Sequence, residues 1–357
     1  MWTDEAAYLT RAHRSKRGVY RPEQLRRLLA PKSIAIVGAS SRPGAFGATT
    51  LSNLHGYSGN VYLVNPRYDR IFEHRCYPRL SEIPEVPDCV VICVPRNRVE
   101  AIVVECAEFG VGGAVVYASG FAETGIAERI EEQSRLAAIA RESSMRIVGP
   151  NVVGFANFSS QVSCTFVSIP TIAQSQCSIG VVSQSGAVGF SAIQAASHGV
   201  SFSHFLASGN SCDVDVADYI SYLADESSCR AIVCMLEGIS APERLIEAGD
   251  IAWARDKPVI VFKLGTGKAG AAAALSHTGT LAGSDSTYRA AFDRCGMILA
   301  EEHEAVVEMA AFFAKARAPR GHGVAVVTNS GGLGVMLADK AEVHRVPLLP
   351  PSVPFRK

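Results

Sequence analysis

The sequence lacks an excess of charge of either sign, because 34 Lys and Arg residues balance 34 Asp and Glu residues. No global field therefore draws the protein to nucleic acid or to an anionic membrane surface, and we expect neither as a partner. The sequence also lacks a continuous apolar run long enough to span a bilayer, and residues 1–21 carry charges throughout, unlike a secretory signal. These absences favour small ligands that are recognised locally.

Paired cysteine spacings are also missing. The ten cysteines are scattered, without the pattern of a zinc site or a disulfide framework, and several fall inside apolar runs typical of strands. We therefore expect no metal centre, and we expect buried thiols in the reducing cytoplasm.

Length and patterning predict more than one α/β domain. Apolar runs alternate with helical segments in two series, at 33–37, 61–64, 89–94, 113–117 and 145–148, and then at 178–182, 202–207, 231–236, 258–263 and 297–300. This alternation is typical of parallel sheets covered on both faces. We expect an N-terminal extension over 1–28, a first domain over 29–152 and a second over 153–318. We expect residues 319–357 to form an incomplete third α/β domain, with a buried strand at 323–328 and a helix at 334–344. This domain is either truncated or completed by another chain.

The first predicted strand runs into a turn that contains Gly38, Gly44 and Gly47. Glycines let backbone amides approach a phosphate, and the following helix directs its positive end there; the alternative is a tight turn without a ligand. NAD sites place an acidic residue after the second strand, but here Val64 is followed by Asn-Pro-Arg, which disfavours NAD. Arg42 and Arg67 suit the sugar phosphate of NADP or CoA, unless they are solvated surface charges.

A second turn of the same kind follows the strand ending at Val182 and contains Ser183, Ser185 and Gly186. It suits a phosphoryl group, and Ser185 could equally cap a helix that begins at Gly186. Glu237 follows an apolar run and should lie at the carboxyl edge of a central strand, although it could also be a surface carboxylate. His277 lies among small residues, where a neutral imidazole could act as a nucleophile.

Short motifs in a fixed order resemble one family. They are GASSRPGAFG at 38–47, NP at 65–66, ASGFAE at 118–123, GPN at 149–151, VSQSGAVG at 182–189, SGN at 208–210, LEG at 236–238 and SHTGTLAGSD at 276–285. Together they are similar to the NDP-forming acyl-CoA synthetases, which are relatives of the succinyl-CoA synthetase α subunit. The match runs from about Leu29 to the C-terminus, and the SHTG-x-LAGSD stretch is its most specific part.

The resemblance implies a Rossmann-like CoA-binding domain, then a flavodoxin-like ligase domain with a histidine loop, and the start of a third α/β domain. The implied CoA site comprises Gly38, Ser40, Arg42, Gly44, Gly47, Pro66, Arg67 and Pro95. In the family, the histidine matched by His277 takes phosphate from an acyl phosphate or from ATP, and the glutamate matched by Glu237 holds it. The helix start matched by Ser183, Ser185 and Gly186 steadies the phosphohistidine.

The implied reaction joins a carboxylic acid to CoA with ATP, giving acyl-CoA, ADP and phosphate. In the family an ATP-grasp module handles ATP or ADP with Mg, and nothing in this sequence resembles one. We therefore expect an ATP-grasp β subunit, or further C-terminal domains, as the partner. Two positions depart from the family pattern, Asn151-Val152 and Gly267-Lys268. A non-catalytic CoA-binding or sensing protein and an NADP-binding oxidoreductase are the alternatives, and the sequence does not identify the acid.

Overall fold

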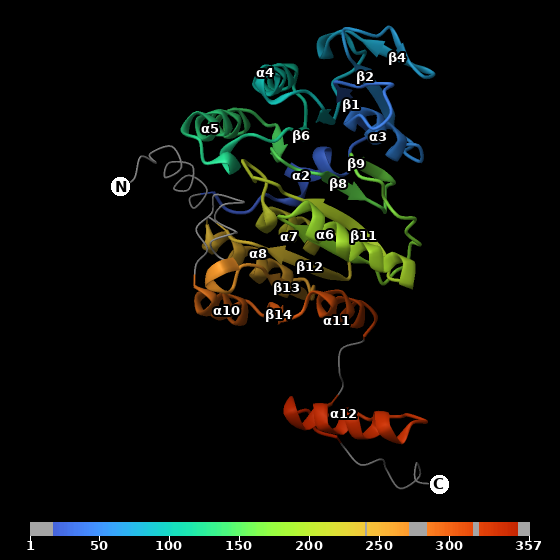
Figure 1. Cartoon of the computed structure of the whole chain (residues 1–357), viewed down its shortest axis with the longest axis vertical. Helices are drawn as coiled ribbons and strands as arrows, with labels where there is room; N and C mark the ends of the chain where they lie inside the picture. Colours follow the sequence, from blue (N-terminus) through green and yellow to red (C-terminus); the bar gives the residue numbers. More distant parts are fainter. Residues whose placement is uncertain (1–16, 240, 271–283, 317–320, 349–357) are drawn as a thin grey trace. The chain divides into compact units, whose positions relative to one another are not determined.

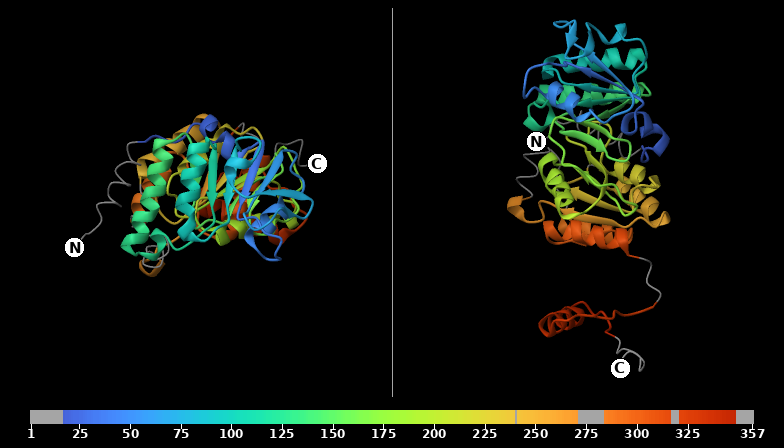
Figure 2. Two further views of the ribbon diagram at one scale, coloured as in Figure 1. Left: turned by 90° about the horizontal axis from the view of Figure 1, so that it is seen from above. Right: turned by 90° about the vertical axis from the view of Figure 1, so that its right-hand side faces the viewer.

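The computed structural model describes residues 17–239, 241–270, 284–316 and 321–348 (Figure 1). The chain divides into a large unit, residues 1–315, and a small unit, residues 316–357. The large unit contains two mixed sheets of seven strands each, and most neighbouring strands run parallel. Figure 2 shows these two α/β layers from two further sides.

The first sheet has the strand order β3-β4-β2-β1-β5-β6-β7. Its strands are β1 (Ser33–Val37), β2 (Asn60–Val64), β3 (Arg70–Ile71), β4 (His74–Tyr77), β5 (Cys89–Ile92), β6 (Gly113–Val116) and β7 (Arg146–Val148). Its helices are α2 (Pro22–Leu29), α3 (Phe46–Asn53), α4 (Val99–Phe109) and α5 (Ala127–Glu142). Alternate residues of β1 enter different cores: Ala35 joins α4 and α5, whereas Ile34 joins α2 and residues of the second sheet. Burial on both faces explains why the strand is continuously apolar.

The second sheet has the order β14-β13-β12-β10-β11-β8-β9. Its strands are β8 (Gly154–Asn157), β9 (Val162–Thr165), β10 (Ile179–Ser183), β11 (Phe202–Ala207), β12 (Ala231–Leu236), β13 (Val259–Lys263) and β14 (Ile298–Ala300). Its helices are α6 (Gly186–Ile193), α7 (Val216–Asp225), α8 (Pro242–Ala254), α10 (Asp285–Arg294) and α11 (His303–Lys315). In each sheet, successive strands are added first on one side and then on the other, and this change of side occurs beside β1 in the first sheet and beside β10 in the second. Open α/β sheets bind ligands at the carboxyl ends of strands at such switch points.

The ten strands predicted in the two domains are all present, with ends that differ by no more than two residues. The hairpin β8–β9 was not predicted, because the sequence there reads as a polar, turn-rich stretch. Its first strand is held by antiparallel pairing with β11, for example Phe155 opposite Leu206. Eight of the ten cysteines are buried, as the apolar runs around them predicted.

The small unit contains α12 (Gly331–Val343), which begins after the N-cap Ser330 and confirms the predicted helix. The prediction of a buried strand at 323–328 was wrong. Val324 forms only an isolated bridge with Leu348, and Val327 is 97% exposed. Among the described residues no second strand completes a ladder there, and an unpaired segment cannot bury its backbone polar groups.

A buried ionic cluster joins the N-terminal segment to the second sheet's helices. The carboxylate of Asp218 on α7 is fully buried and accepts hydrogen bonds from Arg17 (3.0 and 3.1 Å), from the Tyr20 amide (2.7 Å) and from Arg244 on α8 (2.6 Å). The hydroxyl of Tyr20 donates to Asp213 at 2.5 Å. The cluster therefore holds the segment before α2 against α7 and α8.

Candidate active site

The first glycine turn lies at the carboxyl end of β1 and is shaped by close backbone packing. Gly38 has φ +86°, and a Cβ there would lie 2.7 Å from the carbonyl oxygen of Cys93. The side chain of Asn65, which follows β2, donates to the carbonyl of Ala39 at 2.7 Å and fixes the turn from the other side. In the described part of the chain, the amide of Gly47 in the first turn of α3 has no hydrogen-bond acceptor. The turn therefore offers the Gly47 amide at the positive end of a helix, where a phosphate would bind.

Two arginines stand beside this turn on loops of different strands. Arg42 lies in the turn itself, where its amide donates to Ser40 Oγ at 3.1 Å, and Arg67 follows Pro66 after β2. Both side chains are exposed, and neither makes an ion pair with a carboxylate within the described ranges. Pro95, which precedes a short helical turn after β5, lies at the same sheet edge. The predicted residues thus come together at the switch point, with cations available for a sugar phosphate.

The second predicted turn lies at the carboxyl end of β10. Ser185 is the N-cap of α6 and accepts from the Val188 amide at 3.4 Å, as predicted for a capping serine. The buried hydroxyl of Ser183 donates to the Ser185 carbonyl at 2.6 Å, so it shapes the turn. A Cβ on Gly186 would lie 2.5 Å from the side chain of Val153. The Ser185 hydroxyl hydrogen and the first amides of α6 are the groups that could meet a phosphoryl oxygen.

Glu237 follows β12, the strand next to β10, and is 6% exposed. The expectation that it lies at the carboxyl edge of a central strand is confirmed, and a solvated surface carboxylate is excluded. Three side chains that sequence reasoning did not select hold the backbone of this loop, namely Gln184, Lys263 and Tyr288. Gln184 lies inside the VSQSGAVG motif, and a lysine that ends an apolar strand was the available signal for Lys263. His277 lies outside the described residues, so its pairing with Glu237 stays a prediction.

The carboxyl edges of the two sheets meet along a polar seam. Asn210, in the loop after β11, donates to Glu123 in the loop after β6 at 2.5 Å. Its carbonyl oxygen accepts from Asn151 at 3.1 Å. The seam is therefore built from the ASGFAE, GPN and SGN motifs. Because β11 pairs with β10 and β6 pairs with β5, it connects the edge of the first turn to the edge of the second.

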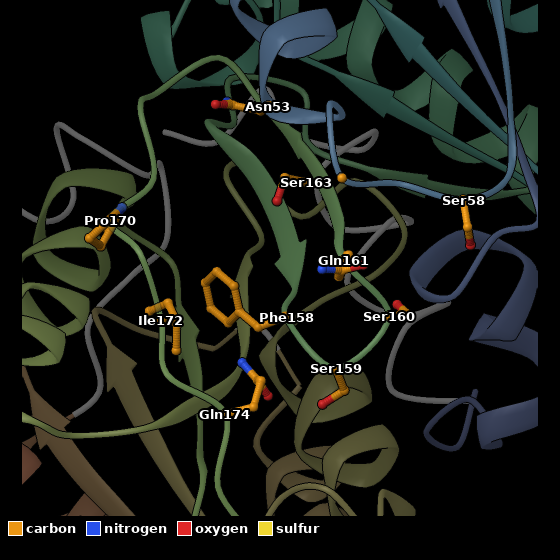
Figure 3. A pocket seen from close by; sticks show the side chains of 11 residues that line it. Asn53, Ser58, Phe158, Ser159, Ser160, Gln161, Ser163, Pro170, Ile172 and Gln174 are labelled. Atoms are coloured by element: carbon orange, nitrogen blue, oxygen red, sulfur yellow. The ribbon is translucent and has the colours of Figure 1, made fainter.

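A separate pocket of about 540 Å³ opens between the end of α3 and the turn of the β8–β9 hairpin (Figure 3). Its lining includes Ser159, Gln161 and Gln174, and no charged side chain contributes to it. The hairpin turn lies at the amino end of β11, where Phe158 donates its amide to Ser203. This pocket therefore coincides with neither predicted phosphate turn.

The described residues contain neither a candidate metal site nor a candidate membrane-spanning helix. In the ranges that the structure covers, no group of three or more His, Cys, Asp or Glu side chains could hold a metal ion. No helix in those same ranges combines the length and apolar character needed to cross a bilayer.

Comparison with known proteins identifies both large domains. Residues 32–157 match the CoA binding domain family, and residues 176–313 match the succinyl-CoA ligase like flavodoxin domain family. The chain is 38% identical to the ADP-forming acetate–CoA ligase I of Archaeoglobus fulgidus, over 91% of this chain and 46% of that protein. It is also 38% identical to the α subunit of the ADP-forming acetate–CoA ligase II of Pyrococcus furiosus, over 87% of this chain and 67% of that subunit.

A solved structure shows the same arrangement. The dinucleotide-forming acetyl-coenzyme A synthetase 1 of Candidatus Korarchaeum cryptofilum, in complex with phosphate and ADP, aligns with a TM-score of 0.86 and 33% identity. The alignment covers 92% of this chain and 70% of that one. The chain thus spans about half the length of one relative and about two thirds of the α subunit. By its motifs, its two domains and these relatives, the chain belongs to the ADP-forming acyl-CoA synthetase family and corresponds to the α-subunit-like portion of its members.

Proposed function

We propose that this chain is the CoA-binding and phosphohistidine-bearing part of an ADP-forming acyl-CoA synthetase. The reaction is carboxylic acid plus CoA plus ATP giving acyl-CoA, ADP and phosphate. The observation that carries the proposal is the seam through Asn210 and Glu123, because it joins the carboxyl edges of two sheets that each present a phosphate-type turn. One edge can therefore hold a cofactor phosphate while the other holds the phosphoryl group that is transferred.

CoA would bind at the first turn. Gly38, Gly44 and Gly47 allow close approach to its phosphates, and the guanidinium groups of Arg42 and Arg67, which form no ion pair within the described residues, would meet them. Ser40, Pro66 and Pro95 shape the three loops around that site. CoA supplies the thiol that becomes acylated, and the first domain's role is to orient it toward the seam.

The phosphoryl group would pass through His277. The reaction is reversible: in the direction of acyl-CoA cleavage, phosphate displaces the CoA thiolate to form the acyl phosphate, the neutral imidazole nitrogen attacks its phosphorus, and the carboxylate of the acid leaves as the bond between that oxygen and phosphorus breaks. In the direction of synthesis, ATP phosphorylates His277, the acid takes the phosphoryl group, and the CoA thiol then displaces phosphate from the acyl phosphate. Glu237 would hold the other ring nitrogen and fix the tautomer. The first amides of α6, with the hydroxyl of Ser185, would stabilise the charge on the phosphoryl oxygens. Ser183 and Gly186 keep that turn in shape.

ATP and ADP, with Mg, would be handled by an ATP-grasp β subunit or by further domains of a longer chain. We infer this from the lengths of the relatives, because this chain spans only part of each of them. We place the reaction in the cytoplasm, where CoA and ATP are available and thiols stay reduced.

Mixing the chain with an ATP-grasp β subunit from a related ligase tests this function. Acyl-CoA should accumulate only when ATP, CoA and a suitable acid are all present, and a panel of acetate, succinate and benzoate would identify the acid class. Tight CoA binding without product from any acid would instead favour a CoA-sensing protein.

A further inference from the structure

The loop that carries Glu237 is held by three side chains from three different elements. The backbone of residues 237–239 is buried and carries polar groups that must find partners. Gln184 comes from the turn after β10, Lys263 from the end of β13 and Tyr288 from α10.

Gln184 makes three hydrogen bonds to this loop. Its Oε1 accepts from the amides of Glu237 at 2.7 Å and Gly238 at 2.9 Å, and its Nε2 donates to the carbonyl of Gly238 at 2.6 Å. A primary amide supplies both a strong acceptor and a donor, whereas a carboxylate lacks the donor and a thioether offers only a weak acceptor. Gln184 also lies between Ser183 and Ser185, inside the phosphate-type turn. One side chain therefore sets the relation between that turn and the Glu237 carboxylate.

Lys263 holds the same loop from the opposite neighbour in the sheet. Its Nζ donates to the carbonyl of Glu237 at 2.7 Å and to the carbonyl of Leu264, and it lies 4.7 Å from the centre of the Tyr288 ring. Burial lowers the pKa of Lys263, while the charges of Asp285 and Glu237 act in the opposite direction. Leu264 begins the stretch of sequence that leads to His277. The Lys263 ammonium therefore binds the backbone at the start of that stretch as well as the backbone of the Glu237 loop.

We infer that Gln184 is a positioning residue for phosphoryl transfer: it holds the Glu237–Gly238 backbone so that the carboxylate keeps a fixed place relative to the phosphate-type turn. Lys263 secures the same backbone from β13. The inference rests on the proposed function, because it assigns a role within that reaction. A shift of about 1 Å in such a group lowers a rate by about a hundredfold without weakening a ligand held elsewhere.

The test uses the full chain with acetyl-CoA, succinyl-CoA or benzoyl-CoA and radiolabelled inorganic phosphate. Gln184→Met removes the three hydrogen bonds at nearly constant size, and Gln194→Met is the control because Gln194 is exposed at the far end of α6 from the turn. We expect the labelling rate of Gln184→Met to fall at least tenfold, while the acyl-CoA concentration for half-maximal rate changes less than twofold. Gln194→Met should match the wild type.

A second variant covers the case in which Gln184→Met does not fold, as judged by loss of CoA binding. Lys263→Met should then show the same loss of rate with unchanged half-saturation. Wild-type labelling with equal labelling of a folded variant would overturn the inference and leave the proposed function intact. Absence of label on the wild type with all three acyl-CoA compounds would reject the proposed function, and the inference with it.

Discussion

Replacing Asp218 by Asn removes the charge at the centre of the buried ionic cluster. The asparagine keeps the size of the side chain but places an amide donor beside the guanidinium groups of Arg17 and Arg244. Arg17 and Arg244 then lose their shared carboxylate, and among the described residues Arg244 keeps only its ion pair with Asp215, in a region from which water is excluded, since Asp218 and Arg244 are 0% and 1% exposed.

Removing one partner of a buried ion pair typically costs about 3–5 kcal/mol. Asp218 has two cationic partners, so we expect the free energy of unfolding to fall within this range. That loss is a large share of the roughly 5–15 kcal/mol that stabilises an ordinary domain. The loop before α7 crosses the seam, and its displacement should also slow any reaction between the two turns.

Asp225→Asn is the matched control, because Asp225 ends the same helix and pairs with Arg255 at the surface. The two side chains are 35% and 56% exposed, and exposed pairs contribute about 0–1 kcal/mol. Urea unfolding followed by far-UV circular dichroism measures both variants. A loss below about 1 kcal/mol for Asp218→Asn, or an equal loss in the two variants, would refute the assignment of the cluster as the main tie between these elements.

The same two variants test how the free energy of unfolding depends on pH. Burial alone would raise the pKa of Asp218, but the charges of Arg244 and Arg17 outweigh it and lower that pKa. The stabilisation is therefore complete above about pH 4, the ordinary pKa of Asp, and is lost as the pH falls through the lower pKa of the folded state. Acid unfolding of Asp218→Asn should lose this dependence, whereas Asp225→Asn should retain it.

Three further predictions each concern a single residue. Burial lowers the pKa of His204 to about 3. The free energy of unfolding should therefore decrease as the pH falls below about 6.5, by up to about 1.4 kcal/mol per pH unit. Urea unfolding of His204→Gln at several pH values should show a weaker dependence on pH, whereas the exposed control His198→Gln should retain it. Gly38→Ala should weaken CoA binding at least tenfold in calorimetry, because its Cβ would meet a carbonyl oxygen at 2.7 Å, whereas Gly321→Ala in the small unit meets no atom within 4 Å and should leave binding unchanged. Asn210→Ala should lower the free energy of unfolding by about 1.5–3 kcal/mol, since it removes a hydrogen bond to a carboxylate across the seam, and an unchanged urea midpoint would show that the seam is not held by this residue.

Local sequence pattern was enough to predict ten of the eleven strands that pair in parallel, and both turns, but not the short strand β4, which pairs with β2. Runs such as 231–236 are buried on both faces, so their composition alone reveals them, and the glycine and serine turns follow directly from them. The strand at 154–157 was missed because it depends on pairing with β11, a contact distant in sequence. The strand at 323–328 was predicted from apolar composition, yet composition cannot supply the neighbouring strand that burial requires.

Residues with chemically distinctive side chains could be selected from the sequence as candidates, whereas residues that bind the backbone of a neighbouring loop could not. Glu237 could be selected because it follows an apolar run, at the carboxyl edge of a strand where open α/β sheets bind their ligands. Gln184 and Lys263 bind backbone groups of a loop on neighbouring strands, and the order of those strands becomes known only with the fold. Their role could not be read from the pattern of residues alone.

We propose that His277 carries the phosphoryl group. Incubating the wild type and His277→Asn with acetyl-CoA, succinyl-CoA or benzoyl-CoA and radiolabelled phosphate, and then exposing the protein to acid and to base, tests this directly. A phosphohistidine at His277 should give a label on the wild type that is lost in acid and stable in base, and no label on His277→Asn. A label that persists in His277→Asn, or a wild type that accepts none, would contradict it.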